Sequence, residues 1–284
     1  MAVAIALVAA LGVLGIHQGE PPASPGTGKV TTTASGPSSF QGAWKAATVE
    51  AAPVQEAPVE AATVEPAPVQ EVPVEAAPVE AEVPTSFAVA DAIGPTVSIF
   101  VEPGVPYADR PTLANPTNEG LPVVFLVIED QGAWLKVRVS SRPNNLIAWV
   151  QRSEVNLRTV PNRVLVEIGA RQVTVFQGEQ VLLQETVAVG SDRTPSPLGN
   201  FFVDGIVPLS PDTGPYGAGQ VSVSGFSDVL QSFGGGVGQI ALHGTNQPQL
   251  LGQPVSNGCV RMTNDAITRM AQLAPLGTPV DIVA

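Results

Sequence analysis

The chain has 284 residues, 44% of them hydrophobic, and a formal net charge of −12 at pH 7. This length is enough for about two domains with buried cores. Residues 1–93 hold ten acidic and two basic residues (−8), which leaves fifteen acidic and eleven basic residues (−4) for 94–284. No basic stripe runs through the sequence. Nucleic acid is therefore excluded as an expected partner, because phosphate binding needs clustered Lys and Arg.

The N-terminus is apolar: residues 2–16 carry no charge, and His17 and Glu20 end the run. These fifteen residues are fewer than the ~20 that a membrane-spanning helix needs, and they fit the apolar core of a signal peptide. No basic residue precedes the run, and no Ala-x-Ala cleavage site follows it directly. We expect an extracytoplasmic protein in which 1–19 is either a signal peptide or a membrane anchor.

Residues 20–92 are predicted to be a disordered linker rich in Pro, Ala, Val and Glu. A 15-residue tandem repeat occupies 48–62 (TVEAAPVQEAPVEAA) and 63–77 (TVEPAPVQEVPVEAA), with thirteen matching positions. Frequent proline interrupts helices and sheet ladders, and the repeated Glu keeps the chain solvated. The segment is predicted to be an extended stalk or, alternatively, a tail without a set reach.

Short strands dominate residues 93–158, with apolar or alternating runs at 97–101, 123–128, 134–139 and 147–150 and a hairpin turn at 130–132. Several short strands without a helix pattern indicate a small β-barrel. The run FLVIEDQGAWLKVRV followed by RPNNLIAWV resembles the SH3-like modules that precede catalytic domains in bacterial cell-wall proteins. That resemblance implies association with the wall.

Residues 160–284 form a second β-rich unit, with strand patterns at 164–168, 173–176, 181–189, 201–203 and 279–283. Asn264 and Asp265 are expected to cap the one helix, which ends before Gly277. Its apolar face consists of Ile267, Met270, Ala271 and Ala274. The predicted fold class is therefore mainly β, with two β domains and one C-terminal helix on the second sheet.

The only cysteine, Cys259, follows His243 by sixteen residues. One Cys and one nearby His are too few ligands for structural zinc, so no metal is expected. A thiol with a pKa of about 8.5 becomes a better nucleophile when an imidazole takes its proton. A lone cysteine can equally be a small buried hydrophobe. The pair makes Cys259 a candidate nucleophile and His243 its candidate base.

The residues around the pair suit acyl chemistry. His243 follows the predicted strand 239–242, a rigid place for a base. Gly258 permits a tight turn beside the sulfur, and the backbone N–H groups of Asn257, Gly258 and Cys259 are candidate donors to an oxyanion. Ser256 is either a member of this site or only a turn residue.

The sequence HGTN at 243–246, followed by SNGCVRM at 256–262 and ND at 264–265, resembles the catalytic signature of the L,D-transpeptidases. The segments VAVGSDRTPSPLGNFFV (187–203) and GTPVDIV (277–283) resemble other parts of that family's catalytic domain. The resemblance implies a β-sandwich-type fold, no cofactor, and peptidoglycan stem peptides as donor and acceptor.

The same resemblance assigns roles to individual residues. Cys259 would attack the bond between a diamino acid and D-alanine, with His243 as general base. The carbonyl of Gly244 would orient the imidazole, and Arg261 would support the site or serve only as an ion-pair partner. D-alanine would leave a thioester, and the amine of another stem would resolve it as a 3→3 cross-link. Asn257 stands where the family often has His.

The substrate is expected to contact Tyr216, Phe226, Thr245 and Asn246. Eight glycines among residues 214–238 predict a long loop, either a lid over the site or a flexible surface insertion. Two alternative functions stay open. The first is a wall-binding protein whose catalytic fold has lost activity. The second is a cysteine hydrolase of stem peptides, in which water resolves the thioester.

Overall fold

The computed structural model describes residues 83–210, 214–234 and 236–284, all of which fall within one compact unit of the chain. The predicted signal or anchor at 1–19 and the tandem repeat lie outside the described residues. Within the described residues, no helix is both long and apolar enough to cross a bilayer.

The first sheet begins earlier than predicted. Residues assigned to the linker form strand β1 (Phe87–Ala92), which pairs antiparallel with both β6 (Val124–Asp130) and β9 (Val155–Val160). Val89 and Ala90 on β1 are fully buried. The linker assignment is wrong for these six residues because the Ala- and Val-rich composition of the linker continues into a strand that buries the same residue types.

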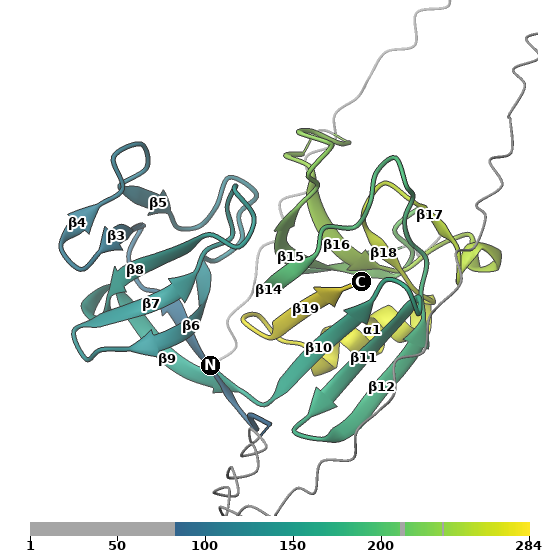
Figure 1. The fold of residues 1–284 in the computed structure, drawn as a ribbon, viewed down its shortest axis with the longest axis horizontal. Helices are drawn as coiled ribbons and strands as arrows, with labels where there is room; N and C mark the ends of the chain where they lie inside the picture. Colours follow the sequence, from purple (N-terminus) through teal and green to yellow (C-terminus); the bar gives the residue numbers. More distant parts are fainter. Residues whose placement is uncertain (1–82, 211–213, 235) are drawn as a thin grey trace, which may run out of the picture. The chain divides into compact units, whose positions relative to one another are not determined.

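The first sheet has seven strands in the order β4-β3-β8-β7-β6-β1-β9 (Figure 1). Its other strands are β3 (Phe100–Glu102), β4 (Val105–Pro106), β7 (Trp134–Arg138) and β8 (Ile147–Gln151). The 3-10 turn η1 (Arg152–Glu154) precedes β9, and β2 (Thr96–Ser98) pairs separately with β5 (Thr112–Ala114). The strands predicted at 123–128, 134–139 and 147–150 are confirmed within one or two residues. The SH3-like relationship stays a prediction.

The second sheet has eight strands in the order β12-β11-β10-β19-β14-β15-β16-β18 (Figure 1). Its first strands are β10 (Asn162–Glu167), β11 (Gln172–Gln177), β12 (Gln180–Thr186) and β14 (Gly199–Pro208). The later ones are β15 (Gly219–Phe226), β16 (Gln239–His243), β18 (Val260–Arg261) and β19 (Pro279–Val283). A short pair, β13 (Val189–Gly190) with β17 (Pro254–Ser256), lies beside it, and η2 (Pro248–Leu250) precedes β17.

Strand β14 joins the two parts of the second sheet. Its first half pairs with β19, and its second half pairs with β15 after a register shift between Val203 and Gly205. Helix α1 (Asn264–Leu273) buries Ala266, Ile267 and Met270 against this sheet. Across residues 83–210, 214–234 and 236–284, the fold is therefore mainly β with one α-helix near the C-terminus.

Two details of this region differ from expectation. The N-cap of α1 is Thr263, whose hydroxyl accepts from the Ala266 N–H at 3.1 Å, because the Asn264 side chain is engaged elsewhere.

The prediction of a long loop at 214–238 is also wrong, since the middle of this segment is strand β15. Alternation of Val and Ser at 221–224 is a strand pattern that the glycine count concealed. Only residues 227–238 connect β15 to β16.

The two sheets share an apolar cluster. Val89, Val124, Leu126 and Val160 of the first sheet pack with Phe202 of the second. Next to it, Arg158 contacts both Asp91 at 2.7 Å and the Leu276 carbonyl at 2.8 Å. These contacts pack strands β1, β6 and β9 against β14 and the segment after α1.

Candidate active site

Cys259 and His243 lie at the parallel pair of strands β16 and β18. The register matches Leu242 with Val260 and His243 with Arg261, and Cys259 directly precedes β18. A hydrogen bond from the Ala241 backbone reaches the thiol. Side chains two residues apart on a strand point to the same face, so Cys259 and Arg261 share the face of Ala241 and His243. The sheet thus joins two groups that lie sixteen residues apart in the sequence.

The ring of His243 is held in one tautomer. Its Nδ1 lies 2.6 Å from the Gly244 carbonyl oxygen, which can only accept a hydrogen bond, so Nδ1 carries the proton. Nε2 therefore keeps its lone pair and can accept a proton. The ring is 4% exposed and lies against Tyr216, with ring centroids 4.7 Å apart.

Burial keeps both groups neutral at pH 7. Desolvation lowers the pKa of His243 to about 4, with a further lowering by the charge of Arg261. Desolvation also raises the pKa of the Cys259 thiol, although the Ala241 backbone and Arg261 act in the opposite direction. Cys259 is therefore a thiol and not a thiolate in this resting state, because burial outweighs the Ala241 hydrogen bond and the Arg261 charge.

The turn before β18 is fixed by hydrogen bonds. Ser256 is buried; its hydroxyl donates to the Cys259 carbonyl at 2.5 Å and accepts from the Gly258 N–H at 3.1 Å. Gly258 has φ +113°, and a β-carbon there would lie 2.9 Å from Ile240 Cδ1. Glycine is needed at this position for both reasons. Its N–H, a candidate oxyanion donor, is occupied by Ser256 in this structure.

Arg261 supplies the positive charge of the site. Its backbone exchanges two hydrogen bonds with Ala188, at 2.8 and 2.9 Å, which fix the outer side of β18. Its Nε is buried and has no hydrogen-bond partner among the described residues. A buried guanidinium N–H without a partner is costly, and a bound carboxylate or oxyanion would satisfy it.

Asn264 is a site residue whose role the sequence did not reveal. Its Oδ1 accepts from the Ala218 N–H at 3.2 Å and from the Thr245 N–H at 3.1 Å. A β-carbon on Gly217 or Gly244 would collide with this oxygen. Asn264 therefore joins α1 to the segment after His243 and to the segment that carries Tyr216. No local pattern indicates such a role, since Asn at a helix start is ordinarily read as a cap.

A cavity of about 230 Å³ lies over the thiol. Its walls include Cys259, Tyr216, Gln239 and Phe233, together with Glu119 from the first sheet. Of the other predicted substrate contacts, Thr245 is buried and Asn246 is exposed. Asn257 is exposed and is absent from this wall. The structure thus brings Tyr216 to Cys259 but leaves Asn246 and Asn257 toward solvent.

Comparison with known proteins identifies the region that carries this cavity. The family model of the YkuD L,D-transpeptidase catalytic domain matches residues 161–282. YkuD of Bacillus subtilis (strain 168) is 35% identical over 124 residues, 44% of this chain and 67% of that protein. YkuD of Bacillus licheniformis is 34% identical over 128 residues, 45% of this chain and 68% of that protein. The chain belongs to the L,D-transpeptidase family.

Solved structures are more distant. An L,D-transpeptidase from Mycobacterium smegmatis aligns with 66% of this chain and 99% of its own, at 16% identity and a TM-score of 0.37. Bd1075 of Bdellovibrio bacteriovorus aligns with 44% of this chain and 47% of its own, at 26% identity and a TM-score of 0.33. The family assignment rests on the sequence relatives and not on these superpositions.

The loop between β15 and β16 of the L,D-transpeptidase domain is anchored to the first sheet. Arg142 donates to the carbonyls of Ser227 (2.8 Å), Leu230 (3.0 Å) and Val237 (3.1 Å). Asn144 donates to the Phe226 carbonyl at 2.7 Å and accepts from its N–H at 2.8 Å. Because Phe233 and Val237 of this loop line the Cys259 cavity, its wall depends on a segment outside the catalytic domain.

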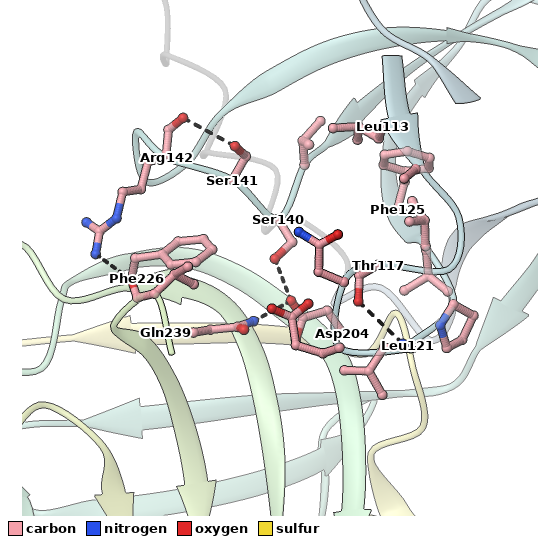
Figure 2. A pocket seen from close by; sticks show the side chains of 18 of the residues that line it. Leu113, Thr117, Leu121, Phe125, Ser140, Ser141, Arg142, Asp204, Phe226 and Gln239 are labelled. Atoms are coloured by element: carbon pink, nitrogen blue, oxygen red, sulfur yellow. Dashed lines mark hydrogen bonds between the residues drawn. The ribbon is translucent and has the colours of Figure 1, made fainter. Parts of the chain in front are cut away.

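A second cavity, of about 460 Å³, lies between the L,D-transpeptidase domain and the first sheet (Figure 2). Phe226, which was predicted to contact the substrate, lines this cavity and not the one over Cys259. Glu119, Val237 and Gln239 line both cavities. The two spaces are therefore neighbours that share one wall.

Among the residues the structure covers, His, Cys, Asp and Glu form no group of three or more that could hold a metal ion.

Proposed function

We propose that this L,D-transpeptidase cross-links peptidoglycan by acyl transfer through Cys259. Family membership supports a transpeptidase that acts on stem peptides. The single observation that supports the residue assignment is the β16–β18 register, in which Cys259 and His243 belong to the same face of neighbouring strands and His243 Nδ1 carries the proton, so that Nε2 can act as the base.

The first half-reaction forms a thioester. His243 Nε2 takes the thiol proton as Cys259 Sγ attacks the carbonyl carbon between the diamino acid and D-alanine of a donor stem. Because both groups rest in their neutral forms, proton transfer accompanies the attack and no ion pair is formed beforehand. The tetrahedral intermediate collapses, the C–N bond breaks, and D-alanine leaves with the proton that His243 returns to its amine.

The second half-reaction transfers the acyl group to an amine. The side-chain amine of an acceptor stem attacks the thioester carbonyl and loses a proton to His243. Cys259 leaves as the thiol when that proton is returned to it. The product is a 3→3 cross-link, and neither half-reaction requires a cofactor.

The developing oxyanion needs donors that the resting structure holds in other contacts. The Gly258 N–H must exchange its bond to Ser256 for one to the oxyanion, while the side chain of Asn257 is exposed. The unpartnered Nε of Arg261 is a further donor at the site. Removal of one such donor in other enzymes costs roughly 3 kcal/mol of activation free energy.

The N-terminal part of the chain fits work at the cell envelope. We propose that 1–19 directs export or anchors the chain, that the Pro-rich segment spaces the enzyme from the membrane, and that the first sheet is an SH3-like module that associates with the wall. These assignments rest on sequence pattern and on the resemblance.

Intact-mass measurement after incubation with a carbapenem tests the assignment of Cys259. We expect one covalent adduct on the full chain, none on Cys259→Ala, and acylation slowed by ~10²–10⁴-fold in His243→Asn. An adduct that survives Cys259→Ala, or no adduct on a chain that unfolds cooperatively, would overturn the proposal. The second result would favour the inactive wall-binding protein.

A separate measurement distinguishes cross-linking from hydrolysis. Purified sacculi are treated with the enzyme, digested with a muramidase and analysed by mass spectrometry. Dimers joined 3→3 with release of D-alanine support the transferase, whereas tripeptide monomers alone support the cysteine hydrolase. Cys259→Ala serves as the matched blank for both products.

A further inference from the structure

A carboxylate lies on the wall of the larger cavity without a counter-ion. Asp204 of β14 accepts through Oδ2 from the Ser140 hydroxyl at 2.5 Å and from Gln239 Nε2 at 2.6 Å (Figure 2). Its other oxygen, Oδ1, is buried and accepts no hydrogen bond from any described residue. One side of the carboxylate is therefore fully bound, and the other has no partner.

The charged groups around this cavity do not neutralise Asp204. Arg142 is occupied by three backbone carbonyls of the β15–β16 loop. Arg110 contacts the Ser141 hydroxyl, donates to the Arg142 carbonyl at 2.9 Å, and pairs with Asp109. Burial raises the pKa of Asp204 to about 6 against the Ser140 and Gln239 hydrogen bonds, and the negative charge of Glu119 adds a smaller rise. Most of the Asp204 carboxylate is thus ionised at pH 7.5.

A buried anion without a cation destabilises a fold, and Asn would preserve most of the contacts at this position without the charge. Buried groups that lack a partner often mark a binding site. Here the missing partner is a cation with at least one N–H donor.

The shape of the cavity restricts what that cation can be attached to. Leu113, Leu121, Phe125 and Phe226 form apolar walls, and the volume of about 460 Å³ is typical of small-ligand sites. An ammonium group on a short alkyl chain matches this combination, since its compact charge can meet one carboxylate oxygen while the chain contacts apolar walls.

The cavity also shares a wall with the cavity over Cys259. Gln239, which holds Asp204, lies on the wall of the Cys259 cavity as well, together with Glu119 and Val237. A ligand whose ammonium lies at Asp204 would have the rest of its chain directed along this shared wall.

We propose that the cavity between the two sheets binds a primary alkylammonium group, with Asp204 as its counter-ion and Ser140 and Gln239 as the residues that orient the carboxylate. Together with the proposed function, on which this part rests, the ligand is the donor peptidoglycan stem, whose own side-chain amine takes no part in the acyl transfer. Asp204 is thus a binding residue that the catalytic signature does not contain.

Binding is tested with n-pentylammonium chloride as probe, by calorimetric titration of the full-length Cys259→Ala chain at pH 7.5. We expect saturable binding that weakens by about tenfold or more in Asp204→Asn, as removal of a charge-assisted hydrogen bond predicts. Affinity falls as the pH is lowered through about 6, where Asp204 becomes protonated. 1-Pentanol, which has the same chain and no charge, does not compete.

Two variants provide controls. Glu119→Gln removes the other carboxylate of the same cavity, and its affinity stays within about threefold of the parent because that carboxylate is not the counter-ion. Leu113→Phe reduces the cavity volume without touching Asp204 and weakens binding. Absence of saturable binding, equal affinity in Asp204→Asn, or a larger loss in Glu119→Gln than in Asp204→Asn would overturn the proposal.

The probe experiment needs no catalysis, so it separates this inference from the proposed function. If the carbapenem adduct forms on Cys259 but the ammonium probe does not bind, the inference fails and the proposed function stands. If the probe binds but Cys259 is never acylated, the cavity site stands and the transpeptidase assignment fails.

Discussion

The two sheets differ in what they bury. The first sheet, from β1 to β9, has an interior of apolar side chains such as Ile99, Phe125 and Leu135. The second sheet buries polar groups as well, and among the described residues every buried polar or charged residue lies in this half. They are Asn162, Thr174, Ser196, Ser222, Ser224, Ser227, His243, Thr245, Ser256 and Thr278.

This contrast indicates that the two sheets have different roles. A sheet with an apolar interior needs little beyond packing, whereas buried polar groups destabilise a fold unless they have partners. The second sheet carries these groups because His243, Ser256 and their neighbours build the site. The first sheet contributes from its loops, where Glu119 lines the Cys259 cavity and Arg142 anchors its wall. The catalytic domain alone therefore does not enclose its own cavity.

The largest effect should come from breaking the first sheet at β1. A chain that starts at residue 83 keeps this strand, whereas one that starts at residue 94 loses the partner of both β6 and β9 and the buried Val89 and Ala90. We expect the shorter chain to lose most of the roughly 5–15 kcal/mol that stabilises a typical domain. Urea unfolding followed by circular dichroism measures the difference. Identical midpoints for the two chains would show that β1 is dispensable.

Two buried groups in the second half of the chain should give opposite pH slopes of stability. The pKa of Asp204 in the folded state is raised from 3.8 to about 6. The contribution of Asp204 to the free energy of unfolding is therefore greatest at low pH and is lost as the pH rises through about 6. The pKa of His243 is lowered from 6.5 to about 4, so its contribution is present above 6.5 and is lost as the pH falls toward 4. Each shift corresponds to about 3 kcal/mol, and the two nearly cancel.

Single variants separate these slopes. Between pH 4 and 6.5, Asp204→Asn should become less stable as the pH falls, because only the His243 contribution remains. His243→Asn should become more stable over the same interval. Urea midpoints at four pH values measure both slopes relative to the unmodified chain. Parallel curves for the two variants would contradict the assignment of either pKa.

A smaller effect is expected from releasing the loop anchor between the sheets. Arg142→Ala removes three hydrogen bonds to backbone carbonyls and should cost about 1–3 kcal/mol of stability and slow carbapenem acylation by about tenfold. Arg152→Ala is the matched control, since Arg152 belongs to the same sheet but pairs with Asp130 at the surface. It should leave both quantities nearly unchanged. Equal acylation rates in the two variants would show that the anchor of the β15–β16 loop does not affect the reaction at Cys259.

The smallest effect is expected at Asn257. Although this position departs from the family signature, its side chain is exposed and lies off the cavity wall. Asn257→His should change the acylation rate by no more than about twofold, the usual range for a surface substitution. A rate increase of tenfold or more would show that the family histidine acts directly on the thiol.

The sequence predicted the parts of this molecule that depend on local pattern. Alternation gave the strands at 134–139 and 147–150, and the two residues whose spacing indicated a pair, His243 and Cys259, lie on or next to the neighbouring strands β16 and β18. Strand β15 was missed because glycine frequency suggested a loop, while alternation of Val and Ser in the same segment was the better indicator.

The rest of the site depends on contacts between distant segments. Asp204 is 64 residues from Ser140, and Arg142 is 85 residues from Ser227. Such pairs follow from how two sheets pack, and no local spacing encodes that arrangement. The predicted strand at 201–203 ends just before Asp204, whereas β14 continues to Pro208 with a register shift between Val203 and Gly205.

The position of Cys259 beside β18 has a consequence for how the protein can lose activity. Strand β18 is the last strand of its sheet. It pairs with β16 at Leu242–Val260 and His243–Arg261, and on its outer side the Ala188–Arg261 bridge covers it. Edge segments with few hydrogen bonds open at lower free energy than the global transition. Heating should therefore inactivate Cys259 by local opening of this edge while both cores stay folded. Amide exchange at Val260 and Arg261 should then detect the inactivation at a lower temperature than a melting curve does.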